Sequence, residues 1–274
     1  MASDRKRPSL LPDTPLADAF GHDPKLVVAG GGDEALGRLF IVMAVAYNDL
    51  KGAALLAYYL KPIIDKTTPI ERACATYGEA AVGEVGGVSQ QIGRLFAGIL
   101  RELMVVLRDH AETIESDRFK LLLQGMPVAP KRAWDRLWGV ATEEDAPPTA
   151  PPPAKPRPRT DADSHLLVLL RNNVAFHYGS KSLANGYRTF FLDNAPSALN
   201  SAAVFADGND MSATRFHFGD AATVGAIERL FGTDAKSVPD RIARVARDVN
   251  VALRFLILGY LARHCGPKKR FRIT

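Results

Sequence analysis

A short polar segment, from Arg171 to Tyr178, contains residue types that suit chemistry on a phosphate ester. Arg171 is a permanent cation whose planar guanidinium can hold a phosphate at two points. His177 can accept and release a proton near neutral pH without a large shift of its pKa. Asn172 adds both a donor and an acceptor. Because these groups directly follow the apolar run 166–170, a buried helix would deliver them to one place.

The spacing of Arg171 and His177 limits how the two side chains can meet. Six residues correspond to roughly 600° of rotation on an α-helix, so the side chains would lie roughly 120° apart. They converge only if the helix ends near His177 or if the partner group comes from a second chain. Gly179 favours the first arrangement, and a two-fold dimer would provide the second.

The pattern Arg171-Asn172-x-x-x-x-His177 resembles the R-x4-6-H motif of the HEPN superfamily, with Asn172 as the polar residue after the arginine. The wider run through Tyr178 resembles abortive-infection members, and a matching helix pattern covers roughly 33–264. The resemblance implies an all-α four-helix bundle that is often a homodimer. It also implies a metal-independent ribonuclease of the toxin or antiviral-defence type, which needs no cofactor and binds no metal.

The resemblance also implies roles for individual residues. Two His177 side chains, one from each protomer, would act as base and acid. Two Arg171 side chains would hold the phosphate and stabilise its developing charge. Asn172 would orient a histidine or the phosphate, and Tyr178 and Lys181 are candidates for binding RNA.

Two other interpretations compete with catalysis. An arginine and a histidine at a helix end often pair only with the helix terminus or a nearby acid, which would leave a non-catalytic module that binds RNA, a nucleotide or a protein. A third possibility is an adaptor that recruits a partner through the proline-rich segment. The polar run Tyr47-Asn48-Asp49, within an apolar helix face, is either a polar turn or a partner for Arg171.

Apolar residues at spacings of three and four predict long helices over 33–61, 89–114, 164–177 and 238–264. Asp33 and Ser89 are expected to cap the first two, Pro62 to stop the first, and Ser237 to open the last through a capping box with Asp240. Shorter helices are predicted over 117–124, 130–139 and 220–231. A loop, with or without one short helix, is predicted over 62–87. Trp134 and Trp138 are expected to pack together.

A small β-hairpin insertion is predicted over 186–219, before the last helix. Its strands would cover 187–192 and 201–218, around the turn signal Asp207-Gly208-Asn209-Asp210. Between 146 and 159, seven of fourteen residues are proline, which favours an exposed extended insertion over 146–160. The remaining chain is predicted to form a disordered or loosely packed segment over 1–30, one domain over 31–266 and a basic tail over 267–274.

The composition fits a globular protein with a sizeable core, since 47% of the residues are hydrophobic and 24% are charged. The net charge is +5, and the basic clusters in the tails suit RNA as a partner. Cys74 and Cys265 are too few for a disulfide framework. No secretory signal is expected, and neither long apolar stretch is expected to reach the length needed to cross a bilayer. The chain is therefore expected in the cytoplasm, without a membrane partner, with an antitoxin or regulator as a further candidate partner.

Overall fold

The computed structural model describes residues 19–66, 76–77, 80–81, 84–143, 163–175, 180–193, 216–266 and 269–271. This part of the chain is all-α, as predicted, apart from four strands of two or three residues. The proline-rich insertion 146–160 lies outside the described residues, as do residues 1–18.

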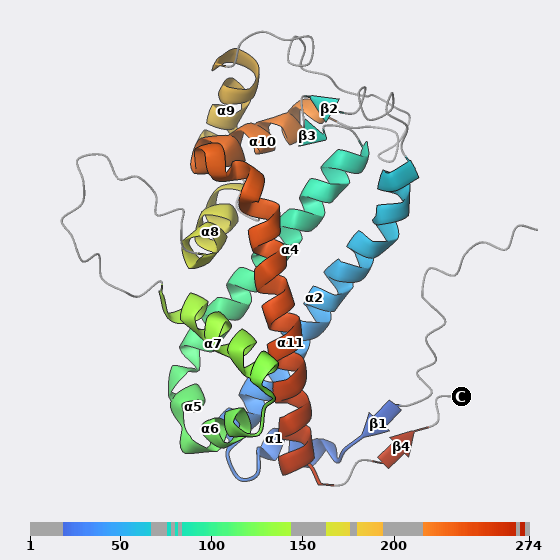
Figure 1. The fold of residues 1–274 in the computed structure, drawn as a ribbon, viewed down its shortest axis with the longest axis vertical. Coiled ribbons are helices and arrows are strands. Elements are labelled where there is room, and N and C mark those ends of the chain that lie inside the picture. Colours follow the sequence, from blue (N-terminus) through green and yellow to red (C-terminus); the bar gives the residue numbers. More distant parts are fainter. Residues whose placement is uncertain are drawn as a thin grey trace, which may run out of the picture.

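Four helices correspond to the four predicted long stripes: α2 (Glu34–Lys66), α4 (Glu84–Asp109), α8 (Asp163–Leu170) and α11 (Val238–His264). Helix α11 runs through the centre of the molecule and packs against the other three, and α4 also contacts α2 and α8 (Figure 1). One continuous core joins them and contains Leu39, Leu100, Leu167 and Leu253, each fully buried.

Three further helices, α5 (Ala111–Glu115), α6 (Asp117–Gln124) and α7 (Val128–Glu143), cover one end of this core (Figure 1). Phe119 of α6 packs between Phe40 and Trp134, with ring centroids 6.0 and 5.2 Å away. The predicted contact of Trp134 with Trp138 is confirmed, since the two rings stack 6.3 Å apart. These aromatic contacts connect α2, α6 and α7 through large buried surfaces.

Several predicted helix boundaries are wrong. Helix α2 continues past Pro62 to Lys66, because a helix can accommodate a proline at the loss of one hydrogen bond. Helix α4 begins at Glu84, before the predicted cap at Ser89, and ends at Asp109. The predicted loop 62–87 also contains a small hairpin in which β2 (Thr76–Tyr77) pairs antiparallel with β3 (Ala80–Ala81).

The predicted β-hairpin over 186–219 is absent from the described residues of that range. Residues expected to form its first strand lie in α9 (Ser180–Arg188) and the π-helical turn η3 (Thr189–Asp193). The end of the expected second strand starts α10 (His217–Phe231), while 194–215 lie outside the described residues. Phe190 is buried against Ala221 of α10, so packing between two helices overrides the β propensity of this aromatic run.

Helices α9 and α10 cross at two glycines. A Cβ added at Gly186 would lie 2.2 Å from the Ala222 carbonyl oxygen and 2.5 Å from the Ala226 nitrogen. A Cβ at Gly225 would lie 2.1 Å from the Gly186 carbonyl oxygen. The two backbones therefore touch directly, which no residue larger than glycine permits.

The start of α11 differs in detail from the predicted capping box. A 3-10 helix, η4 (Gly232–Ser237), leads directly into it and leaves Ser237 with helical dihedral angles, φ −84° and ψ −13°. The Ser237 hydroxyl consequently donates to the Asp234 carbonyl at 2.8 Å and makes no capping bond. The predicted cap of α2 is confirmed, since the Leu36 amide donates to Asp33 Oδ1 at 3.1 Å.

Part of the segment 1–30, predicted to be loosely packed, forms regular secondary structure, and so does part of the predicted basic tail 267–274. Strand β1 (Ala19–Gly21) pairs antiparallel with β4 (Lys269–Phe271). Helix α1 (Pro24–Ala29) follows, and the buried Tyr260 hydroxyl donates to the Val27 carbonyl at 2.5 Å. Burial raises the pKa of Tyr260 to about 12, so its hydroxyl stays protonated and remains a donor at neutral pH.

Helix α2 has a property that the sequence interpretation missed. Its segment Glu34–Leu60 is long and apolar enough to cross a membrane by length and composition, and 28% of its most apolar 18-residue window is buried inside the protein. Asn48 and Asp49 divide this segment, so it contains no uninterrupted apolar run of spanning length. In this structure the buried side packs against α4 and α11.

The glycine crossing predicts opposite effects of the same substitution at two helical positions. Gly186→Ala should lower the free energy of unfolding by about 1–3 kcal/mol, because the added methyl must push α9 away from α10. Gly52→Ala on α2 is the matched control. A Cβ there meets nothing within 4 Å, so this substitution should be neutral or stabilise by about 0.5–1 kcal/mol. Urea unfolding monitored by circular dichroism would measure both, and equal effects would contradict the close crossing.

Candidate active site

Helix α8 is fixed at its beginning by charge and along its length by apolar burial. Asp163, its first residue, accepts from Arg241 Nε at 2.9 Å and from Arg244 Nη2 at 2.9 Å. Leu166 and Leu167 are fully buried and Leu170 is 4% exposed. The apolar run before Arg171 therefore anchors the helix in the core, as the sequence predicted.

Immediately after Leu170, the α-helix widens into a π-helical turn, η2 (Arg171–Ala175). A π-helical turn rotates each residue by less than an α-helix does, so the α-helical geometry assumed from the sequence does not hold over Arg171–Ala175. Within it, the Asn173 amide donates to the Leu169 carbonyl at 2.9 Å. The Asn173 side chain thus gives the Leu169 carbonyl a hydrogen-bond donor at the junction where the backbone changes from α-helical to π-helical hydrogen bonding. Single π-helical turns of this kind are frequent at functional sites.

The π-helical turn places Arg171 against α4. Arg171 Nε donates to Glu102 Oε1 at 2.7 Å, and the two side chains are 34% and 56% exposed. The contact uses the inner nitrogen of the guanidinium. The two outer nitrogens, Nη1 and Nη2, can therefore bind an anion while Glu102 fixes the direction of the group.

The other predicted site residues have different positions. Asn172 is exposed on the π-helical turn, and Lys181 is exposed near the start of α9, which contacts that turn. His177 and Tyr178 lie outside the described residues. The structure therefore brings Arg171, Asn172 and α9 together.

The partner of Arg171 is a residue that sequence reasoning did not identify. Tyr47-Asn48-Asp49 was one candidate, but Tyr47 lines a pocket elsewhere and the carboxylate that Arg171 contacts belongs to Glu102. The sequence signal was only that Glu102 lies on the polar side of a predicted amphipathic helix. Other charged residues share that side, so the pairing required the tertiary structure.

The described part of the chain contains no group of three or more histidine, cysteine, aspartate or glutamate residues placed to hold a metal ion. Comparisons with protein-family models, curated proteins and solved structures find no match for this chain. The function of the Arg171 site is therefore inferred from its own geometry and chemistry.

The exposure of the Arg171–Glu102 pair predicts that it contributes little to stability. Glu102→Gln should lower the free energy of unfolding by less than about 1 kcal/mol, because both charges remain accessible to water. Asp248→Asn is the comparison, since Asp248 is 14% exposed and accepts two bonds from Arg136, at 2.8 and 2.6 Å. It should cost about 1–3 kcal/mol. Urea titrations would measure the free energy of unfolding of both variants. If Glu102→Gln lowered it as much as Asp248→Asn does, Arg171 would have a structural role.

Proposed function

We propose that this protein is a metal-independent endoribonuclease of the toxin or antiviral-defence type. In this proposal the Arg171 guanidinium binds the scissile phosphate and His177 transfers the proton. The observation that carries the proposal is the placement of Arg171. Its side chain is partly exposed on a π-helical turn and is held at Nε by Glu102, and its outer nitrogens form no ion pair or hydrogen bond with another described residue. A HEPN-type arrangement of the bundle is part of the same proposal.

The chemistry follows from what RNA cleavage requires without a metal. A base takes the proton of the 2′-hydroxyl, and the resulting oxygen attacks the phosphorus. The bond from phosphorus to the 5′-oxygen breaks, and an acid protonates that oxygen. His177 and the partner's His177 would serve as base and acid, with Arg171 stabilising the additional negative charge on the phosphate. The products are a 2′,3′-cyclic phosphate and a 5′-hydroxyl.

Glu102 has a defined role in this proposal. Its carboxylate limits the rotation of a long flexible side chain before RNA binds, which lowers the entropic cost of positioning Arg171. The same negative charge weakens the attraction of the site for any phosphate. Glu102 is therefore a positioning residue, which improves the orientation of the Arg171 side chain while it weakens the affinity of the site for phosphate.

This opposing charge is also the observation that favours a second candidate function. If the Arg171–Glu102 pair only ties the π-helical turn to α4, the protein is a non-catalytic module that binds RNA, a nucleotide or another protein. An antitoxin or regulatory protein would then be the natural partner class. Cleavage activity distinguishes this alternative from the ribonuclease.

The catalytic proposal predicts a specific pattern of loss. His177→Ala should reduce the rate of RNA cleavage by roughly two to four orders of magnitude, as expected for a general acid or base. Arg171→Lys should also be impaired, because a point charge cannot replace the planar fork. Wild-type cleavage should persist in EDTA and should fail on DNA, which lacks the 2′-hydroxyl. Gel assays with end-group analysis of the products would measure these effects.

Two controls make this test decisive. His165→Ala, on α8 of the same protein, should retain wild-type cleavage, and circular dichroism should show that every variant is folded. Glu102→Gln should cleave more slowly if Glu102 orients Arg171, yet it should bind RNA as tightly as wild type or more tightly. Equal cleavage by wild type and His177→Ala, with matched folds, would leave only the binding module.

The two-histidine mechanism further predicts a homodimer, because each protomer supplies one His177. Light scattering at micromolar concentration should give twice the mass of the 29.7 kDa chain. Mixing wild-type with His177→Ala subunits should then give heterodimers with greatly reduced activity, because each shared site keeps only one of the two histidines that serve as base and acid. A monomer that cleaves RNA at full rate would exclude the two-histidine mechanism but not the role of Arg171.

A further inference from the structure

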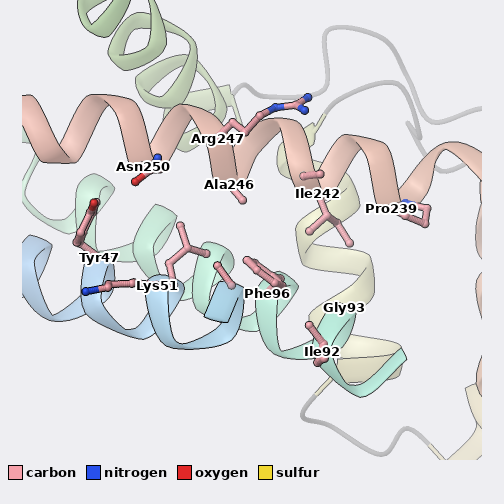
Figure 2. A pocket seen from close by; sticks show the side chains of 13 residues that line it. Tyr47, Lys51, Ile92, Gly93, Phe96, Pro239, Ile242, Ala246, Arg247 and Asn250 are labelled. Atoms are coloured by element: carbon pink, nitrogen blue, oxygen red, sulfur yellow. The ribbon is translucent and has the colours of Figure 1, made fainter. Parts of the chain in front are cut away.

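A second site lies where α2, α4 and the first half of α11 meet. The pocket there has a volume of about 500 Å³, within the range of small-molecule sites. Figure 2 shows side chains from all three helices around it. None of its lining residues belongs to the Arg171 site, so its function is independent of the proposed ribonuclease.

One end of the pocket is apolar. Its walls there come from α4 and α11 and include Ile92, Gly93, Phe96, Pro239 and Ile242 (Figure 2). Ile92 is 7% exposed and Ile242 is 8% exposed, while Phe96 is partly exposed. A hydrocarbon or aromatic group bound here would bury apolar surface of the pocket and of the ligand. The free energy gained is proportional to the apolar area that is buried.

The other end is polar. Tyr47 of α2 and Asn250 of α11 point toward one another across it, and Lys51 lies one turn after Tyr47 on α2 (Figure 2). These side chains supply a hydroxyl, an amide and an ammonium group to one end of an otherwise apolar pocket. A ligand that matches this division has one polar head and an apolar body.

The charge of the lining indicates the sign of that head. Lys51 and Arg247 are both cations, although the Arg247 guanidinium points away from the pocket in Figure 2. None of the described residues that line the pocket is aspartate or glutamate. Neither cation forms a salt bridge with another described residue. The field at the polar end therefore favours an anion.

We propose that this pocket binds a small amphiphilic anion, with one carboxylate at the Tyr47–Lys51–Asn250 end and a hydrocarbon body along Phe96, Ile92 and Ile242. Lys51 selects the charge of the head, and Tyr47 and Asn250 provide hydrogen-bond donors to its oxygens. The apolar end selects an extended chain and accounts for most of the affinity. A medium-chain fatty carboxylate has this chemistry.

The test is calorimetric titration of the full chain with decanoate, below its critical micelle concentration. Decanoate should bind with one site per chain, and decyltrimethylammonium, of equal chain length and opposite charge, should bind at least about tenfold more weakly. Lys51→Glu should weaken decanoate binding by about tenfold or more, because an attraction becomes a repulsion. Lys120→Glu reverses an exposed charge on α6 and should leave binding unchanged.

A second variant tests the apolar end without disturbing the fold. A Cβ at Gly93 meets nothing within 4 Å, so Gly93→Leu should fill the pocket and abolish decanoate binding while α4 stays helical. Gly259→Leu, at an equally open helical position of α11 outside the lining, is the matched control.

Several results would overturn the proposal. Equal affinity for decanoate and decyltrimethylammonium would show that the head charge is not recognised. Unchanged binding of decanoate by Gly93→Leu would show that the ligand binds elsewhere. If the folded wild-type protein did not bind decanoate, the proposed binding site would be excluded. If Gly93→Leu instead converted a dimer into a monomer in light scattering, a second copy of the chain would be the occupant of this pocket.

Discussion

The burial of one face of α11 along its whole length is the constraint on which the rest of the described structure depends. Val249, Leu253 and Tyr260 on this face are fully buried, and α2, α4, α6, α7 and α8 all contact the same helix. Burying one such aliphatic or aromatic side chain stabilises a fold by roughly 1.5–3 kcal/mol. The placement of these five helices therefore follows from how they pack on α11.

The Arg171 site and the pocket are two consequences of this packing. Helix α8 is held against α4 and α11 by its leucines and by the bonds of Asp163 to Arg241 and Arg244, and the π-helical turn then meets Glu102 on α4. Along α4, Ile92 and Phe96 precede Glu102 and line the pocket with α2 and α11. One helix thus contributes to a charged, exposed site and to an apolar, partly enclosed one.

Much of the fold could be predicted from the sequence, because amphipathic periodicity is local information. The ends of α6 and α11 agree with their predicted residues, and α2 and α4 cover most of their predicted ranges. The α-helix predicted over 164–177 ends at Leu170, where a π-helical turn begins. The prediction of a β-hairpin was wrong where aromatic and β-branched residues such as Thr189 and Phe190 indicated a strand. Their packing against α10 depends on the contact between Gly186 and Gly225, which are far apart in the sequence. The predicted C-terminal end of α2 was wrong because a proline weakens a helix without always stopping it.

For the site, the sequence by itself determined which residue types could bind a phosphate and transfer a proton, and it determined that an apolar helix leads into them. Side-chain chemistry and periodicity are properties of the chain alone. Only the tertiary structure decided that Arg171 begins a π-helical turn, that Glu102 is its partner and that Tyr47 faces Asn250 across a pocket. Glu102 lies 69 residues from Arg171, and Tyr47 lies far from Asn250 along the chain. Such pairings arise from how whole helices pack, and no local pattern encodes them.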